Sequence, residues 1–286
     1  MISVLIPIYN FDCTVLLQSL AMQAKQLDVE YEIIAFEDGS TSFLQENASA
    51  SDLYHIKYKQ RKHNIGRSAI RNLLAKEARF DYLIFLDCDV IPADDNFLYT
   101  YILQIRQNNK VDILYGGRKV SNEGLVKPEI ALNWLTCFFR ENHKHFLSNN
   151  FLIRKDIFNN ISFNENLKGY GHEDSLFAND AIDHGYQIRF IDNSVCCQHL
   201  ETNEVFLSKT RSSLENMSWI IDHYPRAERI RIVKKYNSLK SLYLDKAIAS
   251  IFQSKREKLE KKLIKKPNLY FFDLYKLGYL CMIRNK

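Results

Sequence analysis

Apolar runs of strand length alternate with helix-like segments through the first half of the chain, and this alternation limits the fold more than any other feature. The strand-like runs are 2–8, 31–37, 53–59 and 82–86, and the helix-compatible segments are 13–26, 41–50, 65–78 and about 95–108. A β-α-β-α order predicts a mostly parallel sheet with helices on both faces. We therefore expect an α/β fold that binds its ligands beyond the carboxyl ends of the strands.

The second half of the chain is less regular. Segments 111–120, 148–158 and 186–199 are interpreted as strands, and residues 169–185 as a glycine-containing loop that leads into a helix. Glu173 and Asp174 then fall in the first turn of that helix, where the helix dipole stabilises negative charge. From about residue 204 the pattern is helical, with breaks expected at Pro225 and Pro267.

Asp87 and Asp89 follow the apolar run Tyr82–Leu86 directly. Two carboxylates in a D-x-D arrangement at the end of a buried strand can bind Mg²⁺ or Mn²⁺, and such an ion often bridges to phosphate oxygens. A polar turn is an equally good interpretation of this pair taken alone, because Asp94 and Asp95 are close by. The choice depends on the other motifs of the chain.

Six motifs occur in a specific order, although each of them is loose. They are IPIYN (6–10), EDGS (37–40), HNIGRSAIRN (63–72), FLDCDV (85–90), GYGHEDSLF (169–177) and His199. With this set the chain resembles the inverting glycosyltransferases of family 2, which have the GT-A fold, over roughly residues 1–205. The Glu-Asp segment is also similar to the C-terminal part of galactosyl- and N-acetylgalactosaminyltransferases.

The resemblance implies a Rossmann-like domain for nucleotide-diphospho-sugars at 1–205. Its nucleotide-binding half would be 1–110 and its acceptor half 111–205, followed by a helical basic extension at 206–286. The implied donor site is a set of eight residues. They are Pro7, Tyr9 and Asn10 around the base, Asp38 on the base imide, Asn64, Gly66 and Arg71 beside the nucleotide, and Asp87 on the ribose or sugar.

The resemblance also implies a metal site and a catalytic pair. Asp89 and His199 would bind Mn²⁺ or Mg²⁺, Asp174 would be the catalytic base, and Glu173 would hold hydroxyl groups of the donor or acceptor. Tyr170, Gly171 and Asn149 would contact the acceptor, with Asn150 as the alternative to Asn149. Many relatives have Trp-Gly-Gly before the Glu-Asp pair, so His172 in place of a glycine leaves the acceptor open.

The function implied is metal-dependent transfer of a sugar from a UDP-sugar to a hydroxyl group of a glycan or glycolipid, in surface polysaccharide synthesis. A phosphohydrolase of the haloacid dehalogenase type is the alternative, with Asp87 as nucleophile and Asp89 as acid/base. That motif requires Thr or Val at the position of Ile91, and it leaves IPIYN and EDGS without a role. An inactive sugar-binding relative is a third interpretation, against which the intact acidic residues argue.

Charge is concentrated at the end of the chain. Residues 254–286 contain ten Lys or Arg and three Asp or Glu, which gives this segment a formal charge of +7. The whole chain has a formal net charge of +5, so residues 1–253 carry −2. This balance argues against a nucleic-acid partner. The basic and aromatic tail suits an anionic membrane surface, packing on the body, or a dimer contact.

The remaining features predict a cytoplasmic enzyme, peripheral on the inner membrane face if the tail binds lipid. The start MISVLIPIYN lacks the marks of a signal peptide, and no stretch approaches the ~20 apolar residues that span a bilayer. The six cysteines form no C-x-x-C pair, which favours a reduced compartment and no structural zinc.

Overall fold

The computed structural model describes residues 1–107, 111–120, 126–141 and 145–285. The chain divides into two compact units. The first, which we call the sheet unit, comprises Met1–Ser121, Glu141–Asn166 and Glu173–His199. The second, the helical unit, comprises Asn122–Arg140, Leu167–His172 and Leu200–Lys286. Each is described by itself below.

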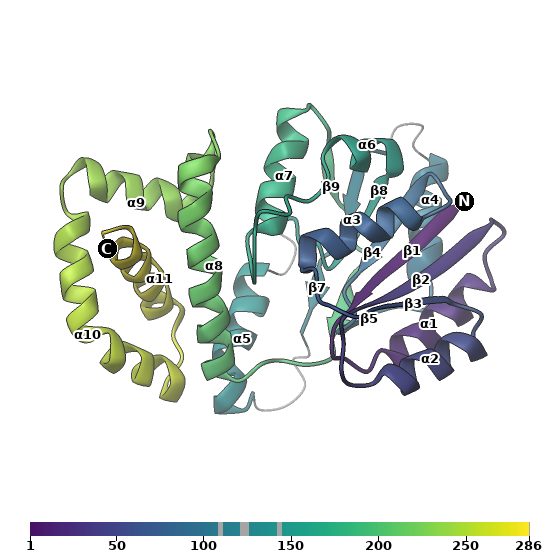
Figure 1. Cartoon of the computed structure of the whole chain (residues 1–286), viewed down its shortest axis with the longest axis horizontal. Helices are drawn as coiled ribbons and strands as arrows, with labels where there is room; N and C mark the ends of the chain where they lie inside the picture. Colours follow the sequence, from purple (N-terminus) through teal and green to yellow (C-terminus); the bar gives the residue numbers. More distant parts are fainter. Residues whose placement is uncertain (108–110, 121–125, 142–144, 286) are drawn as a thin grey trace. The chain divides into compact units, whose positions relative to one another are not determined.

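The sheet unit begins with parallel strands joined through helices, as the alternating pattern predicts (Figure 1). Its elements are β1 (Ile2–Ile8), α1 (Thr14–Ala24), β2 (Tyr31–Asp38), α2 (Leu44–Leu53), β3 (Lys57–Arg61), α3 (Arg67–Glu77), β4 (Tyr82–Leu86), β5 (Val90–Pro92), α4 (Phe97–Gln107), β6 (Ile113–Tyr115), β7 (Arg118–Lys119), β8 (Asn150–Arg154), α6 (Lys155–Asn160), α7 (Glu173–Asp183), β9 (Ile188–Phe190) and β10 (Val195–Cys197). The main sheet has the order β3-β2-β1-β4-β8-β6-β9, in which only β8 runs antiparallel to its neighbours. The predicted α/β fold with a mostly parallel sheet is confirmed.

Helices cover both faces of this sheet, because successive strand residues point to opposite faces. In β1, Val4 and Ile6 face one core together with residues of α1 and α4, while Leu5 faces the other core with α3, α6 and α7. The second core is rich in aromatic rings, and Phe85 stacks on Phe151 with ring centroids 4.8 Å apart. This core packs against β4 and β8, and the end of β4 and the start of β8 lie side by side at the edge where Asp87 follows.

A second, three-stranded sheet has the order β5-β10-β7. Strand β10 pairs antiparallel with β5, so that Cys197 lies opposite Val90, and parallel with β7, so that Val195 lies opposite Arg118. This small sheet brings three distant segments together. It places the D-x-D segment, the end of β10 and Arg118 side by side.

Four predicted strands differ from the observed ones. The strand predicted at 53–59 begins only at Lys57, and the strand predicted at 148–158 ends at Arg154, where α6 begins. Segments 111–120 and 186–199 each divide into two strands, one in each sheet. In the first of them Gly116 has no room for a side chain, because a Cβ there would lie 1.9 Å from the carbonyl oxygen of Asn193. A glycine pair at 116–117 thus lets the chain leave one sheet and enter the next.

The helical unit contains α5 (Ala131–Thr136), α8 (Asn203–His223), α9 (Arg231–Ser241), α10 (Asp245–Lys265) and α11 (Leu269–Arg284). The breaks expected at Pro225 and Pro267 are present, and Tyr243, with φ of 58°, marks another between α9 and α10. Leu263, Tyr275 and Leu280 are fully buried, which explains the apolar part of the tail as a packed core. Among the described residues no helix has the length and apolar character needed to cross a membrane.

Candidate active site

The loop after β2 closely approaches the segment before α3. Gly39 has φ of +74°, and a Cβ on it would lie 2.4 Å from the backbone nitrogen of Asn64, so only glycine fits. Asp38 is 3% exposed, and its carboxylate accepts hydrogen bonds from the backbone N–H groups of Ile65 (2.8 Å) and Gly66 (3.0 Å). Burial raises the pKa of Asp38, and these two hydrogen bonds oppose that rise. The carboxylate therefore fixes the loop, and its oxygens keep further lone pairs for a ligand.

The end of β1 lies beside this loop. Asn10, with φ of 51°, accepts hydrogen bonds through Oδ1 from the N–H groups of Thr41 (2.7 Å) and Ser42 (3.2 Å). Tyr9 is 54% exposed, so its ring is free to stack on a ligand, while Pro7 is half-buried in β1. The structure thus brings Tyr9, Asn10 and Asp38 together at the carboxyl edge of the sheet.

Arg71 and Asp87 form an ion pair at the end of β4. The Arg71 side chain is 3% exposed, and its Nη1 also donates to the carbonyl oxygen of Arg67 (3.1 Å). Its Nε is buried without a protein hydrogen-bond partner among the described residues. A buried polar atom without a partner is unusual and needs an explanation, of which a ligand is one.

The two asparagines at the start of β8 differ in a way that the sequence does not reveal. Asn150 is fully buried and engaged on both ends, because it accepts from Tyr101 Oη (2.7 Å) and donates to the carbonyl oxygen of Asn193 (2.8 Å). Asn149 is 6% exposed, and its Oδ1 has no hydrogen-bond partner in the described part of the chain. Its backbone carbonyl oxygen accepts a hydrogen bond from the N–H of Asp87 (3.1 Å), so the residue with this unpaired Oδ1 lies next to the aspartate pair. Asn150 has a structural role, and Asn149 keeps an atom for a ligand.

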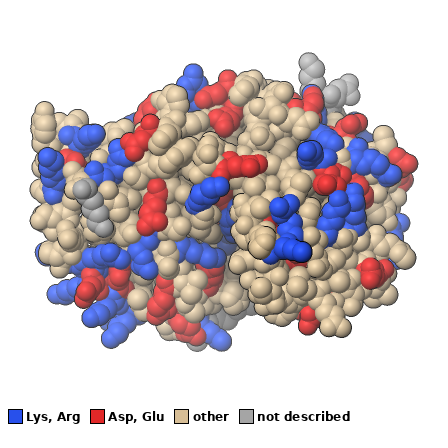
Figure 2. Space-filling model, in the orientation of Figure 1, with Lys and Arg blue, Asp and Glu red and all other residues tan. Residues whose placement is uncertain are grey.

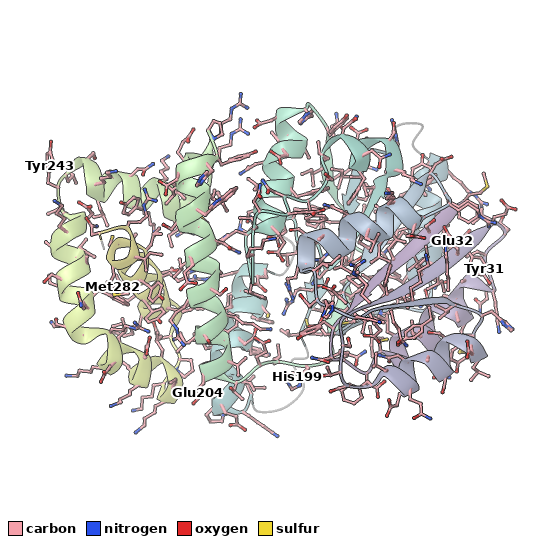
Figure 3. All side chains as sticks on the ribbon, viewed as in Figure 1. Tyr31, Glu32, His199, Glu204, Tyr243 and Met282 are labelled. Carbon is pink, nitrogen blue, oxygen red and sulfur yellow. The ribbon has the colours of Figure 1, made fainter. Side chains whose placement is uncertain are left out.

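Asp89 directly precedes β5, and His199 follows β10, its neighbour in the small sheet, by two residues. The N–H of Gln198 donates to the carbonyl oxygen of Asp89 (3.0 Å), and both Asp89 and His199 are exposed. Figure 3 labels His199. The pKa of Asp89 is raised, first because the surrounding protein limits its hydration and then because Asp87 adds a second negative charge. A cation would relieve both effects.

The donor set for such a cation is incomplete. Within the described residues no group of three or more His, Cys, Asp or Glu side chains could hold a metal. Asp89 and His199 supply two candidate ligands of suitable chemistry. Mg²⁺ is commonly held by one or two carboxylates together with substrate phosphates and water, so the pair fits an ion that arrives with a diphosphate.

Glu173 and Asp174 form the first turn of α7, as predicted. Glu173 is 6% exposed and pairs with Arg67 (Nη1–Oε1 3.2 Å). Burial opposes its ionisation, but the charges of Arg67 and Arg71 outweigh that effect and hold its pKa below the ordinary value. Glu173 is therefore an anion at neutral pH.

Asp174 has the opposite environment. Burial, together with the charge of Glu173, raises its pKa to about 7, and a hydrogen bond from the N–H of Ser175 (2.8 Å) offsets only part of this rise. Two adjacent carboxylates with separated pKa values suit different tasks. A carboxylate whose pKa lies near 7 can accept a proton at neutral pH and pass it on.

Tyr170 and Gly171 belong to the helical unit, where α8 holds their backbone. Asn216 Nδ2 donates to the carbonyl oxygen of Gly171 (3.0 Å), and a Cβ on Gly171 would lie 2.5 Å from Cβ of Ser213. Lys209 Nζ lies 5.1 Å from the centre of the Tyr170 ring. The loop that precedes Glu173 is thus hydrogen-bonded to α8 and packed on it.

Two arginines of the site were not singled out from the sequence. Arg67 precedes Arg71 by one helical turn, and this spacing could have indicated that both face Glu173. The charge of Arg118 stabilises the ionised form of Asp89, and its guanidinium pairs with Glu141 (Nη1–Oε2 3.4 Å). Arg118 reaches the site only through the pairing of β7 with β10, which no local pattern predicts.

Comparison with sequence families gives a match over more than half of the chain. The model described as "Glycosyl transferase family 2" matches residues 3–165. An uncharacterized glycosyltransferase of Haemophilus influenzae is 25% identical over 245 residues, which are 82% of this chain and 91% of that protein. A chondroitin synthase of Pasteurella multocida is 23% identical over 136 residues, which are 46% of this chain and only 14% of that protein.

Solved structures show the same fold at low identity. A mannosyltransferase of Pyrobaculum calidifontis, in complex with GDP-Man and Mn²⁺, has a TM-score of 0.64 at 11% identity and covers 99% of this chain and 86% of its own. TarS 1-349 of S. aureus, in complex with UDP-GlcNAc, has a TM-score of 0.53 at 18% identity and covers 99% of this chain and 91% of its own. The particular similarity to galactosyl- and N-acetylgalactosaminyltransferases is not confirmed.

Proposed function

Because this chain belongs to glycosyl transferase family 2 and is therefore a glycosyltransferase with the GT-A fold, we propose that it transfers a hexose from a UDP-sugar to a hydroxyl group of a glycan or glycolipid, with inversion. Membership of this family argues against the alternative function, a phosphohydrolase of the haloacid dehalogenase type. The observation that carries the proposal is the gathering of charged groups from separate segments at the carboxyl edge of the sheet. They are Arg67, Arg71, Asp87, Asp89, Glu173 and Asp174.

We assign the nucleotide to the carboxyl ends of β1 and β2. The exposed ring of Tyr9 can stack on the base, for which ~1–3 kcal/mol per base is typical. Asp38 can accept a hydrogen bond from the imide N–H of the base. Asn64 and Gly66 hold Asp38 in place through hydrogen bonds to its carbonyl oxygen and its carboxylate. The relatives above include one solved with UDP-GlcNAc and one with GDP-Man, so the uridine specificity is our own inference from Tyr9 and Asp38.

The sugar and the acceptor would meet between β4 and α7 of the sheet unit. Asp87 and the unpaired Oδ1 of Asn149 are adjacent and can bind sugar hydroxyls. Asp174 takes the proton of the attacking hydroxyl, and Glu173, fixed by Arg67, holds the hydroxyls beside it. Tyr170 and Gly171 are proposed as acceptor contacts.

A divalent cation would be held by Asp89 and His199. When bound, Mn²⁺ or Mg²⁺ neutralises negative charge on the departing diphosphate. The protein contributes fixed positive charge of its own through Arg67 and Arg118, both of which act on Asp89. We propose a role in surface polysaccharide synthesis, which the similarity to a chondroitin synthase supports.

A third partner is proposed for the end of the chain, namely an anionic membrane surface. The lysines in the second half of α10 and directly after its end are all exposed, and the ion pairs of the described residues do not include them. They are Lys255, Lys258, Lys261, Lys262, Lys265 and Lys266. Tyr270 (67% exposed) and Leu274 (44% exposed) follow on α11. Figure 2 shows Lys and Arg gathered along the lower edge of the helical unit, with some Asp and Glu among them. Lysines beside an exposed aromatic and an aliphatic side chain suit a lipid headgroup region.

The activity is tested with a panel of UDP-sugars and GDP-Man, each with Mn²⁺ or with EDTA. We expect thermal stabilisation by UDP-sugars, slow release of UDP in the presence of Mn²⁺, and loss of both in Asp89→Ala. Stabilisation by GDP-Man alone would overturn the assignment of uridine. Hydrolysis of p-nitrophenyl phosphate without any nucleotide binding would overturn the proposed function, and nucleotide binding without turnover under any condition would indicate an inactive relative.

A further inference from the structure

Glu37 is a fully buried carboxylate that the proposed reaction does not use. It lies next to Asp38 at the end of β2, and its side chain bonds to residues of α2 and β3 and of the loop that joins β2 to α2. An isolated buried carboxylate is costly unless hydrogen bonds stabilise it. This one therefore needs an explanation.

Three hydroxyl and amide donors converge on the Glu37 carboxylate. Asn47 Nδ2 (2.9 Å) and Tyr58 Oη (3.0 Å) donate to Oε1, and Ser40 Oγ donates to Oε2. All three donors suit an ionised carboxylate, which can only accept. The cluster therefore joins α2, β3 and the β2–α2 loop around a single buried charge.

Two members of this cluster connect it to the loop that follows β1. Ser40 Oγ accepts a hydrogen bond from the N–H of Asn10 (2.9 Å), while its own proton goes to Glu37. Asn47 Nδ2 also donates to the carbonyl oxygen of Phe11 (2.9 Å), and its Oδ1 accepts from the N–H of Cys13 (3.0 Å). Glu37 therefore anchors the two loops that carry Tyr9, Asn10 and Asp38.

We infer that Glu37, acting through Ser40, is a positioning residue that sets the geometry of the nucleobase pocket. The inference rests on the proposed assignment of UDP to Tyr9, Asn10 and Asp38. The ionised Glu37 orients the Ser40 hydroxyl so that its lone pair faces the N–H of Asn10, and Asn10 in turn caps Thr41 and Ser42 through Oδ1. Tyr9 immediately precedes Asn10, so the direction of its ring depends on this chain of hydrogen bonds.

The cluster itself supplies matched variants. Ser40→Ala breaks the connection to Asn10 and keeps the buried charge. Tyr58→Phe removes one donor from the same carboxylate on the β3 side and keeps the hydrogen bonds of Ser40 and Asn47 to the loop after β1. It also removes the hydrogen bond of Tyr58 Oη to the carbonyl oxygen of Leu44 (3.3 Å) at the start of α2. A purely structural role of the cluster predicts that both variants lower stability and leave nucleotide affinity alone, or reduce it equally.

We expect Ser40→Ala to raise the Kd for UDP, measured by calorimetry, at least 5-fold. The ratio of the Kd for GDP to the Kd for UDP should fall, and kcat at saturating donor should stay within 2-fold of that of the unaltered protein. Tyr58→Phe is expected to lower the melting temperature and to keep the Kd for UDP within 2-fold. Glu37→Gln, which replaces one acceptor oxygen by a donor, should resemble Ser40→Ala in its nucleotide affinity.

Two failures are distinguishable. If the unaltered protein binds neither UDP nor a UDP-sugar, the proposed function fails. If the unaltered protein binds UDP and Ser40→Ala binds it equally well, or Tyr58→Phe weakens UDP binding as much as Ser40→Ala does, the positioning role of Glu37 is wrong and the proposed function stands.

Discussion

At the scale of single residues, the two neighbouring carboxylates of α7 show how position in the fold divides one motif into two roles. Glu173 is stabilised as an anion by Arg67 and Arg71, whereas burial and the charge of Glu173 push the pKa of Asp174 to about 7. A base is useful only in its ionised form. The rate should therefore depend on the titration of Asp174.

The first prediction is a pH profile. The value of kcat/KM should rise with pH through about 7 and level off above it, because Asp174 must lose its proton before it can accept one from the acceptor hydroxyl. The measurement is initial UDP release from pH 5.5 to 9 at fixed metal concentration. A rate that is flat between pH 6 and 8 would argue for a different base.

The second prediction concerns Asp174→Asn. The amide keeps an oxygen for the N–H of Ser175 but cannot take a proton, so transfer should fall by roughly 10²–10⁴-fold while UDP still binds. Asp174 resists ionisation in the folded protein, so its carboxylate costs stability progressively as pH rises from about 4 to about 7. The variant should thus melt roughly 2 °C or more above the native protein at pH 8 and no higher at pH 4. Retained transfer would assign the base elsewhere.

Residue-level prediction from sequence succeeds where chemistry and local position suffice. The helix start at Glu173 and the strand end at Leu86, directly before Asp87, follow from pattern, and the structure has both. It fails to distinguish Asn149 from Asn150, because the difference lies in tertiary partners such as Tyr101 and Asn193. It misses Arg118 for the same reason.

At the scale of elements, loops between parallel strands and helices shape the site, and glycines decide how closely they approach. Hydrophobic periodicity predicts β1, β2 and β4 well because these strands are buried on both faces. It merges β6 with β7 and β9 with β10, because only residues 116–117 and 191–194 separate the two strands of each pair, and a strand pattern does not reveal a change of sheet. The small sheet that begins directly after Asp89 could not be predicted from the sequence.

The third prediction uses two glycines as a matched pair. Gly39→Ala forces an alanine into the left-handed backbone conformation and brings its Cβ to 2.4 Å from the backbone nitrogen of Asn64. We expect these two effects to lower the free energy of unfolding by about 2–4 kcal/mol. Gly185→Ala, at φ of +80° with nothing within 4 Å of the new Cβ, should cost only about 1 kcal/mol. Urea denaturation measures both. Only Gly39→Ala should also weaken UDP binding, and equal losses of stability would show that the approach to Asn64 relaxes freely.

At the scale of the whole chain, the basic tail packs through its apolar residues, which is one of the roles that its sequence suggested. Its apolar residues Leu263, Phe272 and Leu280 are buried in the helical unit, while the lysines of α10 stay exposed. Truncation at residue 253 would remove most of α10 and all of α11, and with them much of that core. A test of membrane binding therefore has to change surface charge and keep the fold.

The last prediction is that Lys258→Glu, Lys262→Glu and Lys265→Glu together abolish binding to vesicles that contain anionic lipid. Each Lys near an anionic surface contributes about 1 kcal/mol, so removal and reversal of three charges should lower the partition coefficient by at least 100-fold. The matched control is Lys234→Glu, Lys235→Glu and Lys240→Glu on α9, which makes the same change at exposed positions of the same unit. Co-sedimentation with phosphatidylglycerol vesicles should distinguish the two triple variants, and zwitterionic vesicles should bind neither of them nor the native chain. Equal losses in the two variants would mean that net charge, and not the surface of α10, drives the association; no binding by the native chain would end the proposal of a membrane partner.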